Sequence, residues 1–171
     1  MSLIVEDGTG KSNADSYVTL AECDAYHVNL GNSDWEIDEE DAANVAKREN
    51  AIKKATAFID MRYGGRFKGV RSTAEQALLF PRDGISDNDG YVLENVPTAV
   101  KRATCEAALK IFLGADLMPD LDRGGKIISE TVGPISTTYS SSAPAGTKYE
   151  TIESLLRCCL NGGASVKMIR A

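Results

Sequence analysis

The longest regular pattern of apolar and polar positions runs from Asp38 to Gly65 and predicts one long helix. An acidic run at its start supplies a capping side chain and favourable charge, and the glycine pair at its end supplies a left-handed stop. Arg48 and Lys54 are assigned mostly to the polar face. The apolar face is formed by residues spaced three and four apart, namely Ala42, Val45, Ile52, Ala55, Thr56, Ile59 and Tyr63.

Three further helices are predicted before and after this long helix. The first begins at a capping box formed by Thr19 and Glu22 and ends at Gly31 after about eleven residues. The second follows Val96-Pro97, because proline is tolerated in the first turn of a helix. The last spans residues 149–160 and carries an apolar stripe.

Extended segments are fewer and shorter. Residues 3–5 form a short apolar strand candidate, and a β-hairpin is predicted at about 126–139, with its turn at Gly133-Pro134. The fold class is therefore mainly α, a small bundle of three to four main helices with a β-hairpin and extended terminal arms. Residues 1–163 form one domain, and residues 164–171 form a C-terminal arm.

Composition and charge narrow the function classes. The chain has 171 residues and a net charge of −6, which disfavours a broad nucleic-acid-binding face because such binding relies on lysine and arginine. No apolar run approaches the length of a membrane span, and the N-terminus lacks the features of a signal peptide. The four cysteines show no metal-ligand spacing, and we expect reduced thiols in a cytoplasmic setting.

Three segments suggest chemistry that their patterns do not support. Gly10-Lys11-Ser12 resembles part of a phosphate-binding loop, but Val5 stands where the first glycine is needed and no helix follows directly. His27 has no second histidine and no ligand at a suitable spacing, which favours a structural role. The loop 86–90 resembles a calcium loop in composition only. We therefore expect no catalytic residues, no metal, no cofactor and no enzymatic activity.

One basic and aromatic patch follows the long helix. It consists of Arg66, Phe67, Lys68 and Arg71, with Tyr63 nearby. Such a patch is typical of a solvated loop or a protein contact, and it also suits stacking on single-stranded nucleic acid. The C-terminal arm is a second candidate contact, carried by Val166, Lys167, Met168, Ile169 and Arg170.

Several stretches in order resemble a known group of proteins. They are Asp7-Gly8-Thr9-Gly10, the run from Asn13 to Val18, the run from Gln76 to Gly84, Val96-Pro97, the run from Ser129 to Ile135, and Leu155-Leu156. Together they resemble the head–tail connector, or adaptor, proteins of tailed bacteriophages, of which one branch is labelled DnaT-like single-stranded-DNA-binding protein. The resemblance covers nearly the whole chain.

This resemblance implies a structural virion protein without catalytic residues. It implies a ring, commonly of twelve copies, that lies under the portal, extends the DNA channel and offers a docking face to the tail. The implied partners are the portal protein, a tail-side adaptor, stopper or tail-completion protein, further copies of the chain, and double-stranded DNA that passes without specific binding. The implied location is the virion neck, and the host cytoplasm during assembly. The alternative is a single-stranded-DNA-binding protein, which requires tight and salt-sensitive binding to oligonucleotides.

Overall fold

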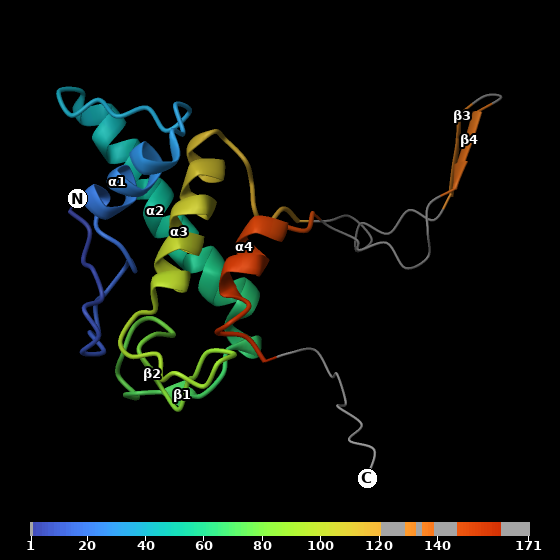
Figure 1. The fold of residues 1–171 in the computed structure, drawn as a ribbon. Coiled ribbons are helices and arrows are strands. Elements are labelled where there is room, and N and C mark those ends of the chain that lie inside the picture. Colours follow the sequence, from blue (N-terminus) through green and yellow to red (C-terminus); the bar gives the residue numbers. More distant parts are fainter. Residues whose placement is uncertain (1, 121–128, 133–134, 139–146, 162–171) are drawn as a thin grey trace, which may run out of the picture.

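The longest element of the fold is a helix of 22 residues. The computed structural model describes residues 2–120, 129–132, 135–138 and 147–161 (Figure 1). The elements in chain order are α1 (Leu20–Leu30), α2 (Ala42–Tyr63), the 3-10 turn η1 (Gly64–Arg66), β1 (Val70–Arg71), β2 (Arg82–Asp83), α3 (Thr98–Phe112), β3 (Ser129–Val132), β4 (Ile135–Thr138) and α4 (Glu150–Leu156). The prediction of a mainly helical chain with an antiparallel hairpin is confirmed.

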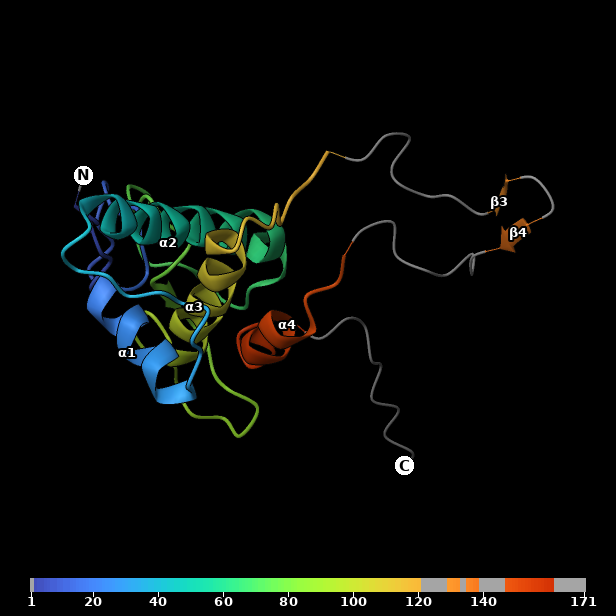
Figure 2. The ribbon, with the colours of Figure 1, turned by 90° about the horizontal axis from the view of Figure 1, so that it is seen from above.

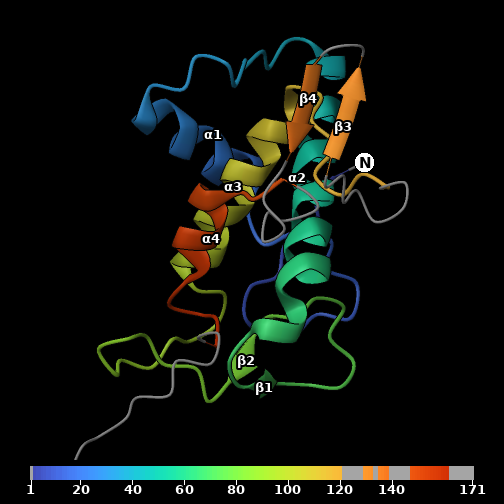
Figure 3. The same cartoon turned by 90° about the vertical axis from the view of Figure 1, so that its right-hand side faces the viewer.

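The helices pack around α3. Figure 2 shows α3 between α1 and α4, with α2 running across it. Small residues on the facing sides of α2 and α3 are fully buried, and they let these two helices lie close together: Ala51, Ala55, Ala103, Ala107 and Ala108. The paired strands β1 and β2 lie at the C-terminal end of α2 (Figure 3).

The predicted beginning and end of α1 are confirmed. The Thr19 side chain accepts a hydrogen bond from the Glu22 amide, and the Glu22 carboxylate accepts one from the Thr19 amide. Gly31 adopts the left-handed conformation that ends the helix. His27 is buried in this helix, where its Nε2–H donates to the Cys105 carbonyl. Burial lowers the pKa of His27, so the structure places it in the core as a neutral packing residue.

The end of α2 differs from the prediction. Gly64 has a φ of −51°, so α2 continues into η1 instead of stopping at a left-handed glycine. A Cβ at Gly64 would lie 2.5 Å from Leu79 Cδ1, so a larger residue there would have to displace the end of the Leu79 side chain. The beginning of α2 is capped by an acidic side chain, as predicted: the Asp41 carboxylate accepts a hydrogen bond from the Ala43 amide at 2.8 Å.

The assignment of Arg48 to the polar face is wrong. Its side chain is fully buried and donates from Nη1 to Asp24 Oδ2 at 2.5 Å and from Nε to Asn44 Oδ1 at 2.8 Å. Asp24 also accepts from the indole N–H of Trp35 at 2.7 Å. This buried ion pair joins α1, α2 and the connection between them, and its partners satisfy a charge that would otherwise be costly to bury.

The remaining strands and the last helix are shorter than predicted. Residues 3–5 form no strand and contribute only a parallel bridge between Val5 and Ser16. The hairpin pairs Ser129 with Thr138 and Val132 with Ile135, inside the predicted range 126–139. The last helix covers seven residues of the predicted range 149–160. Within the described residues no helix is long and apolar enough to cross a membrane, and the predicted arm 164–171 lies outside them.

Candidate functional site

The loop that resembles a phosphate-binding motif is organised around an internal carboxylate. Glu6 is buried, and its two oxygens accept hydrogen bonds from the amides of Gly8, Gly10 and Lys11 at 2.8 to 2.9 Å. The amide groups that would bind a phosphate are therefore occupied by a side chain of the same chain. The segment around Gly10 is therefore a turn held by hydrogen bonds to Glu6.

The predicted basic and aromatic patch does not form one surface. Phe67 is only 4% exposed, and its ring packs edge-on against Phe80 with a centroid distance of 4.9 Å. Lys68 is half-buried and donates from Nζ to two backbone carbonyls, of Ser86 and Cys158. Both side chains hold the fold together. The structure therefore places Phe67 where it cannot stack on a base, because its ring belongs to the core.

The remaining two members of the patch are exposed. Arg71 lies on β1, and its side chain forms no ion pair within residues 2–120 and 147–161. Arg66 lies at the end of η1, where its Nη1 donates to Glu153 of α4 at 2.9 Å. Arg66 thus points toward α4. Its neighbours at α4 line a separate surface.

We call this surface the basic–aromatic groove. It is a hollow of about 400 Å³ between the C-terminal end of α2 and the N-terminal end of α4. Its lining combines three cationic side chains, two tyrosines, one carboxylate and one threonine: Arg62, Arg66, Lys148, Tyr63, Tyr149, Glu153 and Thr147. Cations and aromatic rings together are the features that proteins use to hold a nucleic-acid strand.

The aromatic part of the groove is fixed by packing. Phe58 of α2 contacts both tyrosines edge-on, with ring centroids 6.0 Å from Tyr63 and 5.6 Å from Tyr149. Tyr63 is buried, and this burial, assisted by the negative charge of Glu153, raises the pKa of its hydroxyl. Tyr149 is half-buried, so part of its ring faces the groove. Tyr149 is therefore the aromatic side chain that a base can reach.

The charges in the groove are partly neutralised. Lys148 Nζ lies 2.7 Å from a Glu150 oxygen and 3.9 Å from a Glu153 oxygen, and these carboxylates raise the pKa of Lys148. Arg62 is exposed and has no carboxylate partner among the residues that the structure describes. Among the described residues the groove therefore offers one unpaired cation, Arg62, and two cations paired with carboxylates.

Sequence reasoning identified only Arg66 and, as a neighbour of the predicted patch, Tyr63 among the residues of the groove. Lys148 and Tyr149 are separated from Arg62 by more than eighty positions, so no local pattern links them. The one available signal is the basic and aromatic pair immediately before the last helix. The contact predicted for Val166, Lys167, Met168, Ile169 and Arg170 lies outside the described residues. Within the described residues no group of three or more histidine, cysteine, aspartate or glutamate side chains is placed to hold a metal ion.

One comparison with known proteins gives a match. A family model described as "Putative DnaT-like ssDNA binding protein" matches residues 1–171. Comparison with curated proteins and with solved structures gives no match. The recognition of the chain as a head–tail connector, and with it the description as a virion structural protein, is wrong, because the matching family is a different one. The predicted portal, tail-side and ring contacts followed from that recognition, and the family match does not bear on them.

Proposed function

Because the chain belongs to this DnaT-like single-stranded-DNA-binding family, we propose that it binds single-stranded DNA and that the basic–aromatic groove is the contact surface. The observation that carries the location is the convergence of Arg62, Arg66 and Lys148 on one hollow beside Tyr149. These residues come from two helix ends that only the tertiary structure brings together.

Each feature of the groove has a role in this proposal. Arg62, Arg66 and Lys148 neutralise phosphate groups, and their long side chains adapt to a flexible backbone. The exposed part of the Tyr149 ring offers a stacking surface for one base, and Phe58 behind it holds the ring in place. Stacking accepts any base, so we expect little sequence preference.

The acidic balance of the chain limits the strength of binding. With a net charge of −6, the protein as a whole repels nucleic acid, so attraction depends on local groups of cations such as those of the groove. Three phosphate contacts on a single strand predict that the logarithm of the binding constant falls with the logarithm of salt concentration with a slope of about −2. Binding should therefore be local and salt-sensitive.

The test is fluorescence anisotropy with a labelled oligothymidylate. We expect the wild-type chain to bind it, and the double variant Arg62→Gln/Arg66→Gln to lose most of that affinity and to show a shallower salt slope. The matched control is Arg71→Gln, which removes an exposed arginine of the sequence-predicted patch and should leave the affinity unchanged. Absence of binding by the wild type at low salt, or an equal loss in the control, would overturn the proposal.

A further inference from the structure

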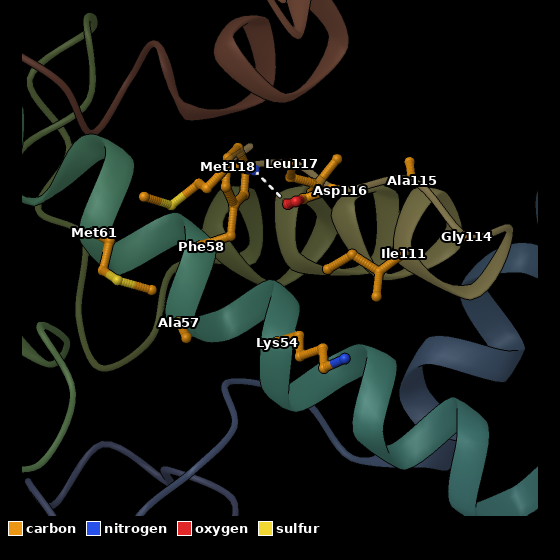
Figure 4. A pocket seen from close by; sticks show the side chains of 10 residues that line it. All are labelled: Lys54, Ala57, Phe58, Met61, Ile111, Gly114, Ala115, Asp116, Leu117 and Met118. Atoms are coloured by element: carbon orange, nitrogen blue, oxygen red, sulfur yellow. Dashed lines mark hydrogen bonds between the residues drawn. The ribbon is translucent and has the colours of Figure 1, made fainter. Parts of the chain in front are cut away.

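Two more hollows lie along α2 next to the basic–aromatic groove. The first, of about 520 Å³, lies between α2 and the chain that follows α3, and Figure 4 shows Met61 and Met118 at one end of it and Ile111 and Lys54 toward the other. Met61 is 66% exposed and Met118 is 47% exposed. Large apolar side chains at such exposure form a surface that is ready to contact another molecule.

The second hollow adjoins the first and lies closer to the N-terminus of α2. It measures about 460 Å³ and shares Lys54 and Ile111 with the first. Its other end is marked by Lys47, whose Nζ lies 4.0 Å from the centroid of the Phe112 ring. At the opposite end of the series, Phe58 lines the first hollow and also contacts Tyr149 of the basic–aromatic groove. The first two hollows therefore follow one another along one face of α2, and Phe58 connects the first of them to the basic–aromatic groove, which lies further around the end of the helix.

Cations accompany the hollows along α2. Lys47 and Lys54 are seven residues apart, about two helical turns, so they share one face, and Arg62 follows eight residues later, about a quarter turn around the helix toward the groove. At about 1.5 Å per residue the row from Lys47 to Arg62 is about 22 Å long. Apolar side chains lie between these charges, so the row alternates groups suited to phosphates with groups suited to bases.

The pairing of lysines differs between the two faces of α2. Lys53 points to the other side and lies 2.7 Å from an Asp15 oxygen. Neither Lys47 nor Lys54 has a carboxylate partner within residues 2–120 and 147–161. Asp116 supplies the one carboxylate that lines the two hollows, and its Oδ1 accepts the Met118 amide at 3.0 Å. The charge of this face is complementary to an anion along its length.

We propose that single-stranded DNA continues from the basic–aromatic groove along this face of α2. Lys54 and Lys47 contact successive phosphates, and bases lie against the apolar floor and the methionines of the first hollow. We call the three hollows together the α2 track. This inference rests on the proposed function, and it adds a second set of contacts and a longer footprint to it.

The test compares short and long oligothymidylates, of about four and about twelve nucleotides, by fluorescence anisotropy. The double variant Lys47→Gln/Lys54→Gln should bind the short oligonucleotide as the wild type does, because the groove alone holds it. For the long oligonucleotide it should lose affinity, and its salt slope should fall by about 1.4, since each phosphate contact contributes about 0.7. The single variant Lys54→Gln is also measured, and Lys53→Gln is its matched control. Lys53→Gln removes the same charge from the preceding residue, whose side chain points toward Asp15.

The outcomes separate the two proposals. No binding of either oligonucleotide by the wild type overturns the proposed function and the track together. The track alone is overturned if binding depends on Arg62 and Arg66 but Lys47→Gln/Lys54→Gln leaves it unchanged at both lengths. It is also overturned if Lys53→Gln loses as much affinity for the long oligonucleotide as Lys54→Gln does. If, in addition, light scattering shows a wild-type oligomer that Met61→Glu converts to a monomer, the hollows are a protein interface.

Discussion

The carboxylate of Glu153 is the feature of the basic–aromatic groove that opposes an anion, and its neutralisation gives the sharpest test. In the unbound structure Glu153 accepts from Arg66 at 2.9 Å, and the two side chains are 27% and 48% exposed. A phosphate that binds Arg66 must displace this partner and then lie close to its negative charge. We therefore predict that Glu153→Gln binds single-stranded DNA more tightly than the wild type.

The size of the effect follows from two contributions. A partly exposed ion pair of this kind contributes at most about 1 kcal/mol, and this stabilisation is lost when the phosphate replaces Glu153. Repulsion between a phosphate and a carboxylate at about 4 Å adds about 1 kcal/mol in a water-like dielectric. Removing both gains about 1 to 2 kcal/mol, which corresponds to a roughly five- to thirty-fold lower Kd.

The measurement is an anisotropy titration at low and at moderate salt. Glu36→Gln is the control, because it removes the same charge from an exposed glutamate that precedes α2, at the end of the helix far from the groove. The free energy of unfolding should fall by less than about 1 kcal/mol in Glu153→Gln, since the pair is partly exposed. An affinity equal to or weaker than that of Glu36→Gln would show that Glu153 does not oppose DNA, and the reasoning about the groove would be refuted.

Three further predictions concern stacking, backbone packing and pH. Tyr149→Ala should weaken binding of single-stranded DNA by about 1 to 3 kcal/mol in an anisotropy titration. Tyr149→Phe should keep the wild-type affinity, because the ring and not the hydroxyl stacks on the base. Equal losses in both variants would contradict this. Gly64→Ala should be less stable in urea unfolding than Gly65→Ala, because its Cβ would lie 2.5 Å from Leu79 Cδ1 and the end of that side chain would have to shift. Gly65→Ala meets nothing within 4 Å and should be neutral or slightly stabilising. If both variants have the same stability, the contact with Leu79 does not constrain the helix end. Burial raises the pKa of Asp60 to about 6, so the folded state binds a proton more tightly than the unfolded state, whose ordinary value is 3.8. The contribution of Asp60 to stability is therefore fully present below about pH 4 and is lost as the pH rises through 6. Urea unfolding from pH 4 to 8 should show this decline in the wild type relative to Asp60→Asn, and a difference that does not change with pH would rule it out.

The sequence determined the features that depend on neighbouring residues. The capping box of Thr19 and Glu22, the left-handed Gly31, the aspartate cap of α2 and the start of α3 after Val96-Pro97 were all predictable, because each uses hydrogen bonds or backbone preferences within a few positions. The mainly helical fold class follows from the same signals. Composition also disfavoured a broad nucleic-acid-binding face, because such a face relies on lysine and arginine and the net charge is −6.

Only the tertiary structure decided which side chains are available. Arg48 and Phe67 have the character of surface or contact residues in the sequence, but Asp24 and Phe80 hold them in the core. Gly64 follows α2 without the predicted left-handed conformation and lies against Leu79. The basic–aromatic groove joins Arg62 and Arg66 to Lys148 and Tyr149, and this contact depends on how α4 packs against the bundle. Contacts between such distant positions are set by the packing of whole helices, and for this reason local patterns predicted the helices but not the groove.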